Sequence, residues 1–276
     1  MNASLNETGS SSFLGASVSG GGMAAIKTAL DTIFAHSNVP PFFARQLIQK
    51  LVTSNPSPAY VSRVSAIFAD NGAGTRGDMK AVIRAVLLDS EARGDTALNS
   101  SSAGKLREPI ARVTGWARAF GAASPSNAWA FGDTSSSSTR LAESPGRSSS
   151  VFNFFRPGYS PPNTAISSAG LVAPEFQITN ELSVVAYINY LQTLIASGAG
   201  DTKADYGVIA TLASDSQALI DQVNLLVASG QLSTATVAAI KAAIDSISLT
   251  ASNGPGNRVG TAILLTMASP DYLTLK

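Results

Sequence analysis

The chain has 276 residues, of which 45% are hydrophobic and 13% are charged, and its formal net charge is +1. A chain of this length can bury a large core without disulfides, and a near-neutral charge argues against a general nucleic-acid-binding protein, which normally has a strongly basic domain. The absence of Cys and the presence of a single His exclude disulfides, thiolate metal sites, Cys nucleophiles and a multi-His metal site within one chain. We therefore expect no metal and no other cofactor.

The first 22 residues are rich in Ser and Gly and end in three consecutive glycines, a composition typical of a flexible arm. They contain neither a basic start nor an apolar core, so we expect no signal peptide in this chain. The longest apolar stretch, Val259–Ala268, has about half of the roughly 20 residues that a membrane crossing needs. We therefore expect no membrane span.

Helical spacing of apolar residues follows along most of the chain. Ser57 with Pro58, and later Asp78, are signals for helix starts. Pro109 should start or kink a helix over 104–121, and the nearly all-apolar segment 175–197 predicts a long, central, buried helix. The remaining expected helices cover 40–53, two segments around Leu219–Leu226 and Val237–Ile247, 256–268, and a short turn from Ser269.

The segment between the helices near residues 121 and 175 lacks helical spacing. Ser-rich patches are followed by the aromatic and proline-rich run Val151–Pro162, which predicts a long ordered loop around residues 132–173. We find no alternating strand pattern and no repeat of fixed period. The predicted fold class is all-α, an irregular multi-helix bundle in which a single helical domain (23–276) follows a flexible Ser/Gly-rich arm (1–22).

Charge is distributed unevenly along the chain. Residues 1–160 hold 15 Lys and Arg against 10 Asp and Glu, a net charge of +5, whereas residues 161–276 hold 4 against 8, a net charge of −4. The first interpretation is that the two halves attract each other, and the second is that the basic half binds an anionic glycan or a phosphate-bearing ligand.

Five stretches of the chain are similar to a known bacterial family, the domain of unknown function 1800. They are Phe42–Val61, Arg76–Val82, Gly104–Pro109, Ser150–Tyr159 and Gly170–Phe176. The resemblance runs from about residue 8 onward and matches only the C-terminal part of the usually longer family members, so we expect the chain to be a fragment of a longer protein. It implies an exported bacterial protein, periplasmic or extracellular, often encoded beside a sulfatase-like protein, and no established activity.

The aromatic run offers candidate ligand-binding residues. Asn153, Arg156 and Tyr159 place polar groups in a proline-braced stretch, as a wall that binds a carboxylate or a sugar would. The structural alternative is that Arg156 caps carbonyl groups or pairs with an acid such as Glu175 while the Phe residues fill the core.

Two candidate catalytic arrangements remain. Glu175 could belong to a glycosidase-like carboxylate pair, although Glu181 lies on another face of the expected helix and an acid from elsewhere would have to complete the pair. Ser102 and Lys105 form a Ser-x-x-Lys motif, which in some esterases supplies a nucleophile and its base, but chance alone produces about one such motif in a chain with this many Ser and Lys residues.

We therefore predict a binding or scaffold module of the bacterial cell envelope, with an envelope or sulfatase-like protein as partner. The alternative is a hydrolase acting on esters or glycans, in which Glu175, or Ser102 with Lys105, does the chemistry.

Overall fold

The computed structural model describes residues 2–5, 7–95, 98, 100 and 102–276. About half of this part of the chain is helical, and its strands form two antiparallel sheets of two strands each, which confirms the all-α class. The contacts divide the chain into two compact units. Unit 1 comprises Met1–Val52 and Pro56–Asn99, and unit 2 comprises Thr53–Asn55 and Ser100–Lys276. The sequence did not predict this division within the expected domain 23–276.

Unit 1 begins with a hairpin and continues with helices. Its elements are η1 (Ala3–Leu5), β1 (Ser10–Phe13), β2 (Ala16–Ser19), α1 (Met23–Ala35), α2 (Val39–Leu51), α3 (Pro58–Ala69), α4 (Met79–Leu88) and α5 (Ser90–Arg93). The turn between β1 and β2 consists of Leu14 and Gly15, which both have positive φ, as a two-residue turn that matches the twist of the strands requires. Residues 10–19 of the expected flexible arm thus form a hairpin.

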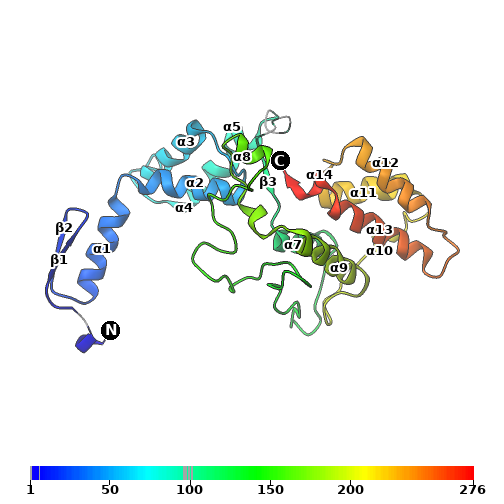
Figure 1. Cartoon of the computed structure of the whole chain (residues 1–276), viewed down its shortest axis with the longest axis horizontal. Coiled ribbons are helices and arrows are strands. Elements are labelled where there is room, and N and C mark those ends of the chain that lie inside the picture. The colour runs from blue at the N-terminus through cyan, green and yellow to red at the C-terminus, as the bar shows by residue number, and fades with distance from the viewer. Residues whose placement is uncertain (1, 6, 96–97, 99, 101) are drawn as a thin grey trace. The chain divides into compact units, whose positions relative to one another are not determined.

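The core of unit 1 lies among α2, α3 and α4, which pack together (Figure 1). It consists of Ala44, Ile48, Tyr60, Val64, Phe68, Val82 and Val86. The predicted caps are confirmed, because the Ser57 hydroxyl accepts from the Tyr60 N–H at the start of α3 and the Asp78 carboxylate accepts from two N–H groups at the start of α4.

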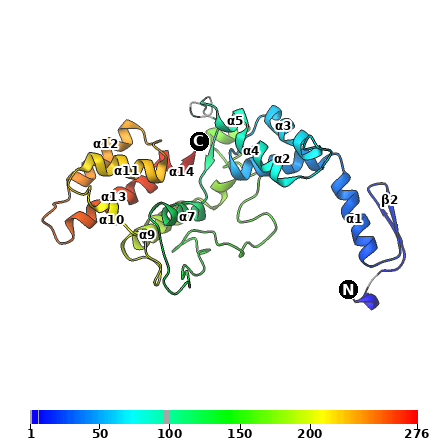
Figure 2. The same cartoon turned by 180° about the vertical axis from the view of Figure 1, so that it is seen from behind.

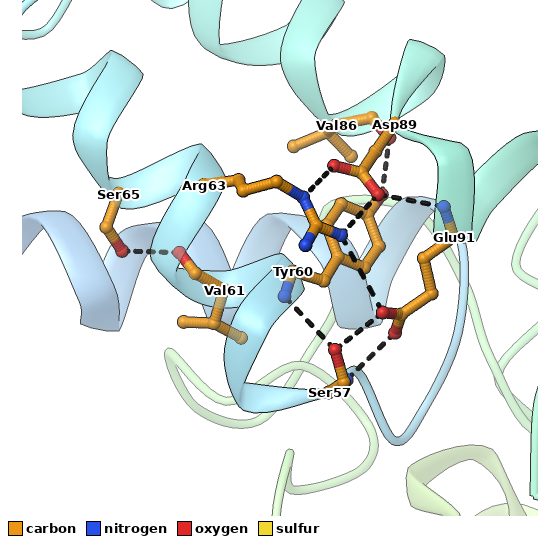
Figure 3. Close-up of polar contacts among 8 residues, drawn as sticks. All are labelled: Ser57, Tyr60, Val61, Arg63, Ser65, Val86, Asp89 and Glu91. Atoms are coloured by element: carbon orange, nitrogen blue, oxygen red, sulfur yellow. Dashed lines mark hydrogen bonds and ion pairs between the residues drawn. The ribbon is translucent and has the colours of Figure 1, made fainter.

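A polar cluster joins the start of α3 to the junction of α4 and α5 (Figure 3). The Ser57 hydroxyl and N–H both donate to Glu91, at 2.5 and 2.9 Å. Arg63 donates two hydrogen bonds to Asp89, at 2.7 and 2.8 Å, and these bonds lower the pKa of Asp89. The cluster satisfies the free backbone groups of two helix starts and therefore has a structural role.

Unit 2 is larger and holds the second sheet. Its elements are β3 (Lys105–Leu106), α7 (Pro109–Ala119), α8 (Ala165–Ser168), η2 (Pro174–Ile178), α9 (Glu181–Ser197), α10 (Gly207–Ala210), α11 (Ser216–Ala228), α12 (Thr234–Asp245), α13 (Gly254–Ala268), α14 (Pro270–Leu273) and β4 (Thr274–Leu275). Helices α11, α12 and α13 pack against one another, and α7 lies beside α9 in both views (Figures 1 and 2). Trp116, Leu191, Leu219 and Ile263 are among the fully buried residues of their shared core.

Two predicted helices of unit 2 differ from the structure. The helix expected over 104–121 begins only at Pro109, because residues 105–106 pair with β4 as strand β3. The helix expected over 175–197 is split into η2 and α9, because Asn180 and Ser183 form a capping box that starts α9 at residue 181. Helix α9 is also less buried than expected, since Leu182 and Val185 are exposed.

The long loop is confirmed in its main part. Between the end of α7 and the start of α8, the described chain has no helix or regular strand, and it runs as an irregular segment beside α7 and α9 (Figures 1 and 2). The short helix α8, at residues 165–168, interrupts the range 132–173 that was predicted as loop. In the described part of the chain, no helix has the length and apolar character that crossing a bilayer demands.

Candidate ligand-binding site

Two of the predicted catalytic residues meet in the structure. The Lys105 ammonium lies 2.9 Å from Glu175 Oε1 and 3.6 Å from Glu108 Oε1. All three side chains are at least nine-tenths buried. Strand β3, the start of α7 and the η2 turn bring them together. The sequence singled out Lys105 and Glu175 separately and did not predict their pairing.

The surroundings of Lys105, Glu175 and Ser102 bear on the esterase and glycosidase hypotheses. Among the described residues, the second carboxylate oxygen of Glu175, Oε2, has no hydrogen-bond partner, and it is shielded from solvent. Lys105 is itself buried between the carboxylates of Glu108 and Glu175. Ser102 is exposed and shares its hydrogen bonds with Ser100. The geometry therefore describes a buried ion-pair network that joins Lys105 and Glu175, with Ser102 exposed nearby in the sequence.

The predicted ligand-binding residues lie on the loop before η2. Arg156 is exposed, and its backbone N–H donates to Gln177 Oε1 at 2.8 Å. Asn153 has a positive φ of 63° and is half-buried. The backbone of Tyr159 bonds to Arg156 and Ala173. Since Glu175 pairs with Lys105, the alternative in which Arg156 pairs with Glu175 is not the arrangement observed.

A cavity of about 730 Å³ lies elsewhere in unit 2, between α7 and the loop that follows it. Helix α7 contributes residues spaced three or four apart, which share one face of a helix, and the loop supplies the opposite wall. The lining residues are Ile110, Val113, Thr114, Ala117, Arg118, Gly121, Ala122, Trp129, Phe131, Gly132, Asp133, Thr134, Leu141, Ser144, Pro145 and Arg147. Its volume lies within the range usual for small-molecule sites, and its wall is largely apolar with a few polar groups.

Helix α7 is held firmly from its other faces. Trp116 is fully buried, and its indole N–H donates to the Tyr206 hydroxyl at 2.9 Å. Burial raises the pKa of Tyr206 to about 12, so the phenol stays neutral. The Arg112 guanidinium lies 4.8 Å from the centre of the Tyr187 ring and donates to the Arg107 carbonyl. These contacts anchor the helix that forms one wall of the cavity, as a preorganised site needs.

The far wall is tied to α7 by buried polar groups. Glu143 is 4% exposed, and its carboxylate accepts from the Ile110 N–H at the start of α7. The Thr134 hydroxyl donates to the Glu143 carbonyl at 2.6 Å, and the Thr134 N–H donates to the Ser144 hydroxyl. These bonds bring residues 134 and 143–144 together and close one side of the cavity.

Trp129 stands at the cavity in an unusual backbone conformation. Its φ is 47°, a left-handed value that costs a bulky residue of the order of 1–3 kcal/mol and occurs mostly where function requires it. Hydrogen bonds hold it there, since its backbone N–H donates to Ser124 Oγ and its indole N–H donates to Asn127 Oδ1. Asp201 accepts from the Ser124 hydroxyl in turn. Although it is held in place, the Trp129 side chain remains 45% exposed.

Three charged side chains line the cavity, and their formal charges sum to +1. Arg147 pairs with Asp133 at 3.1 Å. Hydrogen bonds from Ser135, and to a lesser degree the charge of Arg147, lower the pKa of Asp133, so it stays ionised at neutral pH. Arg118 is exposed, and no residue in the described part of the chain forms an ion pair or side-chain hydrogen bond with it. Its guanidinium is therefore available to a ligand.

No motif in the sequence predicted this site. The available signal was local: Trp129 and Phe131 alternate with small residues in a segment without helical spacing, which follows an amphipathic helix with Arg118 in its last turn. Aromatic residues in a loop are more often functional than those in a core helix. The approach of residues 141–147 to α7 depends on tertiary contacts and had no such signal.

The chain matches one family model over almost its entire length. The model is described as "Protein of unknown function (DUF1800)", and it matches residues 1–274. The match confirms the resemblance carried by the five sequence stretches, and it extends across both units. No curated protein and no solved structure matches the chain.

Proposed function

Because the chain belongs to the DUF1800 family, whose description names no activity, we propose its function from its own geometry: it is a binding module that takes a small ligand into the cavity on α7. The observation that supports this proposal best is the cavity of about 730 Å³, which the exposed Trp129 lines together with residues of α7. Ligand sites in proteins usually have volumes of about 300–1,000 Å³. The strained Trp129 backbone supports the proposal, because a strained, exposed aromatic residue contributes little to folding.

The hydrolase alternative has less support. Its candidate residues Lys105 and Glu175 are buried in an ion pair, so a substrate would have to displace buried charges to reach them. Turnover of an ester or a glycoside that disappears in Ser102→Ala or Glu175→Ala, with unchanged circular dichroism, would favour the hydrolase over the binding module.

The cellular setting is part of the proposal. From the resemblance, we propose that the module acts in the bacterial envelope beside a sulfatase-like partner. Co-purification of the two proteins from the producing cells tests the partnership, and fractionation of those cells tests the location. The charge distribution suggests an anionic glycan as ligand, and the largely apolar wall of the cavity on α7 favours one that also carries an apolar group.

The binding test uses N-phenyl-1-naphthylamine, an uncharged dye that fluoresces in apolar surroundings. The dye should bind the wild-type chain, and Thr114→Phe, which places a ring in the cavity, should abolish most of that binding. Thr193→Phe is the matched control, because Thr193 is also a helical threonine whose hydroxyl bonds to a preceding carbonyl, and it does not line the cavity. Equal dye binding by both variants would refute the assignment of the cavity.

A further inference from the structure

We infer that the ligand of the cavity is an amphipathic anion, with a flat apolar body against Trp129 and Phe131 and an acidic head on the Arg118 guanidinium. This inference rests on the proposed binding function and adds the chemical class of the ligand. The shared chemistry is an oxyanion, either a carboxylate or a sulfur or phosphorus oxyanion, attached to a ring or another flat apolar group.

The apolar part of the inference follows from the wall of the cavity. On the helix side, Ile110, Val113 and Ala117 present aliphatic surface, and on the loop side Trp129 and Phe131 present rings. Few hydrogen-bonding groups remain, because the Thr134 hydroxyl already donates to the Glu143 carbonyl. A ligand covered with hydroxyl groups would leave many of them without a partner here, at a cost for each buried group. An apolar or aromatic body avoids that cost.

The anionic part follows from the charges. Arg147 and Asp133 neutralise each other in their ion pair, which leaves the Arg118 guanidinium as the uncompensated charge among the lining residues. A guanidinium offers several N–H donors in one plane, a geometry that fits a carboxylate or another oxyanion. A cationic ligand would be repelled, and a neutral ligand would leave this charge unused.

The position of Arg118 in the last turn of α7 acts against an anion, because the carboxyl end of a helix carries partial negative charge. In this helix, N–H groups of residues 120–122 donate to carbonyl oxygens of the last turn. These bonds offset the partial charge, so the full charge of the guanidinium dominates the local field.

The experiment compares two dyes with nearly the same ring system. 8-Anilinonaphthalene-1-sulfonate carries a sulfonate, and N-phenyl-1-naphthylamine carries no charge. Arg118→Met removes the charge and retains most of the apolar stem. We expect it to weaken binding of the sulfonate dye by about tenfold and to leave the neutral dye within about twofold, because a charge-assisted hydrogen bond is lost for one dye only. Arg84→Met, at an exposed arginine of α4, is the control and should change neither affinity.

The outcomes separate the two proposals. If neither dye binds the wild-type chain, or if Thr114→Phe leaves both affinities unchanged, the binding function in this cavity is refuted. If both dyes bind in the cavity and Arg118→Met changes their affinities equally, the function stands and the anionic class is refuted. Displacement of the sulfonate dye by 2-naphthoate and by 2-naphthalenesulfonate, against neutral 2-naphthamide, then distinguishes a carboxylate from a sulfur oxyanion.

Discussion

Removal of the Lys105 charge should destabilise unit 2 strongly. In Lys105→Met, an apolar side chain of similar length replaces the ammonium, while the carboxylates of Glu108 and Glu175 stay in place. Both carboxylates are buried, and Glu175 is 2% exposed. Without the cation, the two carboxylates keep their negative charges in a buried site, where neither water nor a counter-ion compensates them.

The magnitude follows from the two distances. At 2.9 Å from Glu175 and 3.6 Å from Glu108, each attraction to the ammonium is worth about 5 kcal/mol at an effective dielectric constant near 20. Much of that sum offsets the cost of dehydrating the three groups in the wild-type fold. When one partner of a buried pair is removed, the dehydration cost of the other remains, and such removals typically destabilise a protein by about 3–5 kcal/mol. Such a loss is a large share of the roughly 5–15 kcal/mol that stabilises a typical domain.

Urea unfolding followed by tryptophan fluorescence measures this loss. The chain has two Trp residues, Trp116 and Trp129, and both lie in unit 2, so the signal reports on the unit that carries the substitution. Lys105→Met/Glu175→Gln should be about 1–2 kcal/mol more stable than Lys105→Met, because it removes one of the uncompensated charges. A loss below about 1 kcal/mol for Lys105→Met, or a double variant less stable than the single one, would refute a buried ionised network.

Three further predictions concern other positions. The hydrogen bonds from Arg63 lower the pKa of Asp89 in the folded chain. The ionised Asp89 therefore contributes to stability above about pH 4, the pKa of Asp in an unfolded chain, and this contribution is lost as the pH falls through the lower pKa of the folded state. When the pH is lowered from 5 to 3, the urea concentration at the unfolding midpoint of unit 1, followed by circular dichroism, should therefore decrease. The decrease should be smaller in Asp89→Asn. Gly104 has a φ of 95°, and a Cβ there would meet a β4 carbonyl oxygen at 2.5 Å. Gly104→Ala should cost about 2 kcal/mol or more in urea unfolding, and more than Gly230→Ala, where φ is also positive and nothing lies within 4 Å. Asp201→Asn should loosen the Trp129 loop and weaken binding of the neutral dye several-fold, while the urea midpoint stays nearly unchanged.

The parts of the fold that depend on residues close together in the sequence were predictable. The caps at Ser57 and Asp78 act within a few residues of the chain, and the structure confirms both. The start of α7 at Pro109 follows from the missing N–H of proline. Where these signals were weak, the prediction failed: the apolar spacing across residues 175–197 hid the capping box at Asn180 that separates η2 from α9.

Contacts between distant residues were not predictable. Strand β3 exists because it pairs with β4, and Lys105 lies opposite Leu275 in that pairing. A two-residue strand has no periodic pattern of its own, so the motif containing Lys105 was interpreted as part of a helix. The pairing of Lys105 with Glu175 likewise joins elements 70 residues apart, and no spacing rule within a single chain connects them.

Two cationic side chains near the ends of α7 therefore differ in what they contribute to stability. Lys105, just before α7, is buried between carboxylates, and its removal should reduce stability. Arg118, in the last turn of α7, is exposed and without a partner in the described structure, so its removal should leave stability nearly unchanged. A charged side chain that adds nothing to folding and lines an apolar cavity is best explained by what it binds. If Arg118→Met reduced the free energy of unfolding as strongly as Lys105→Met, both residues would be structural and the argument for a ligand at Arg118 would fail.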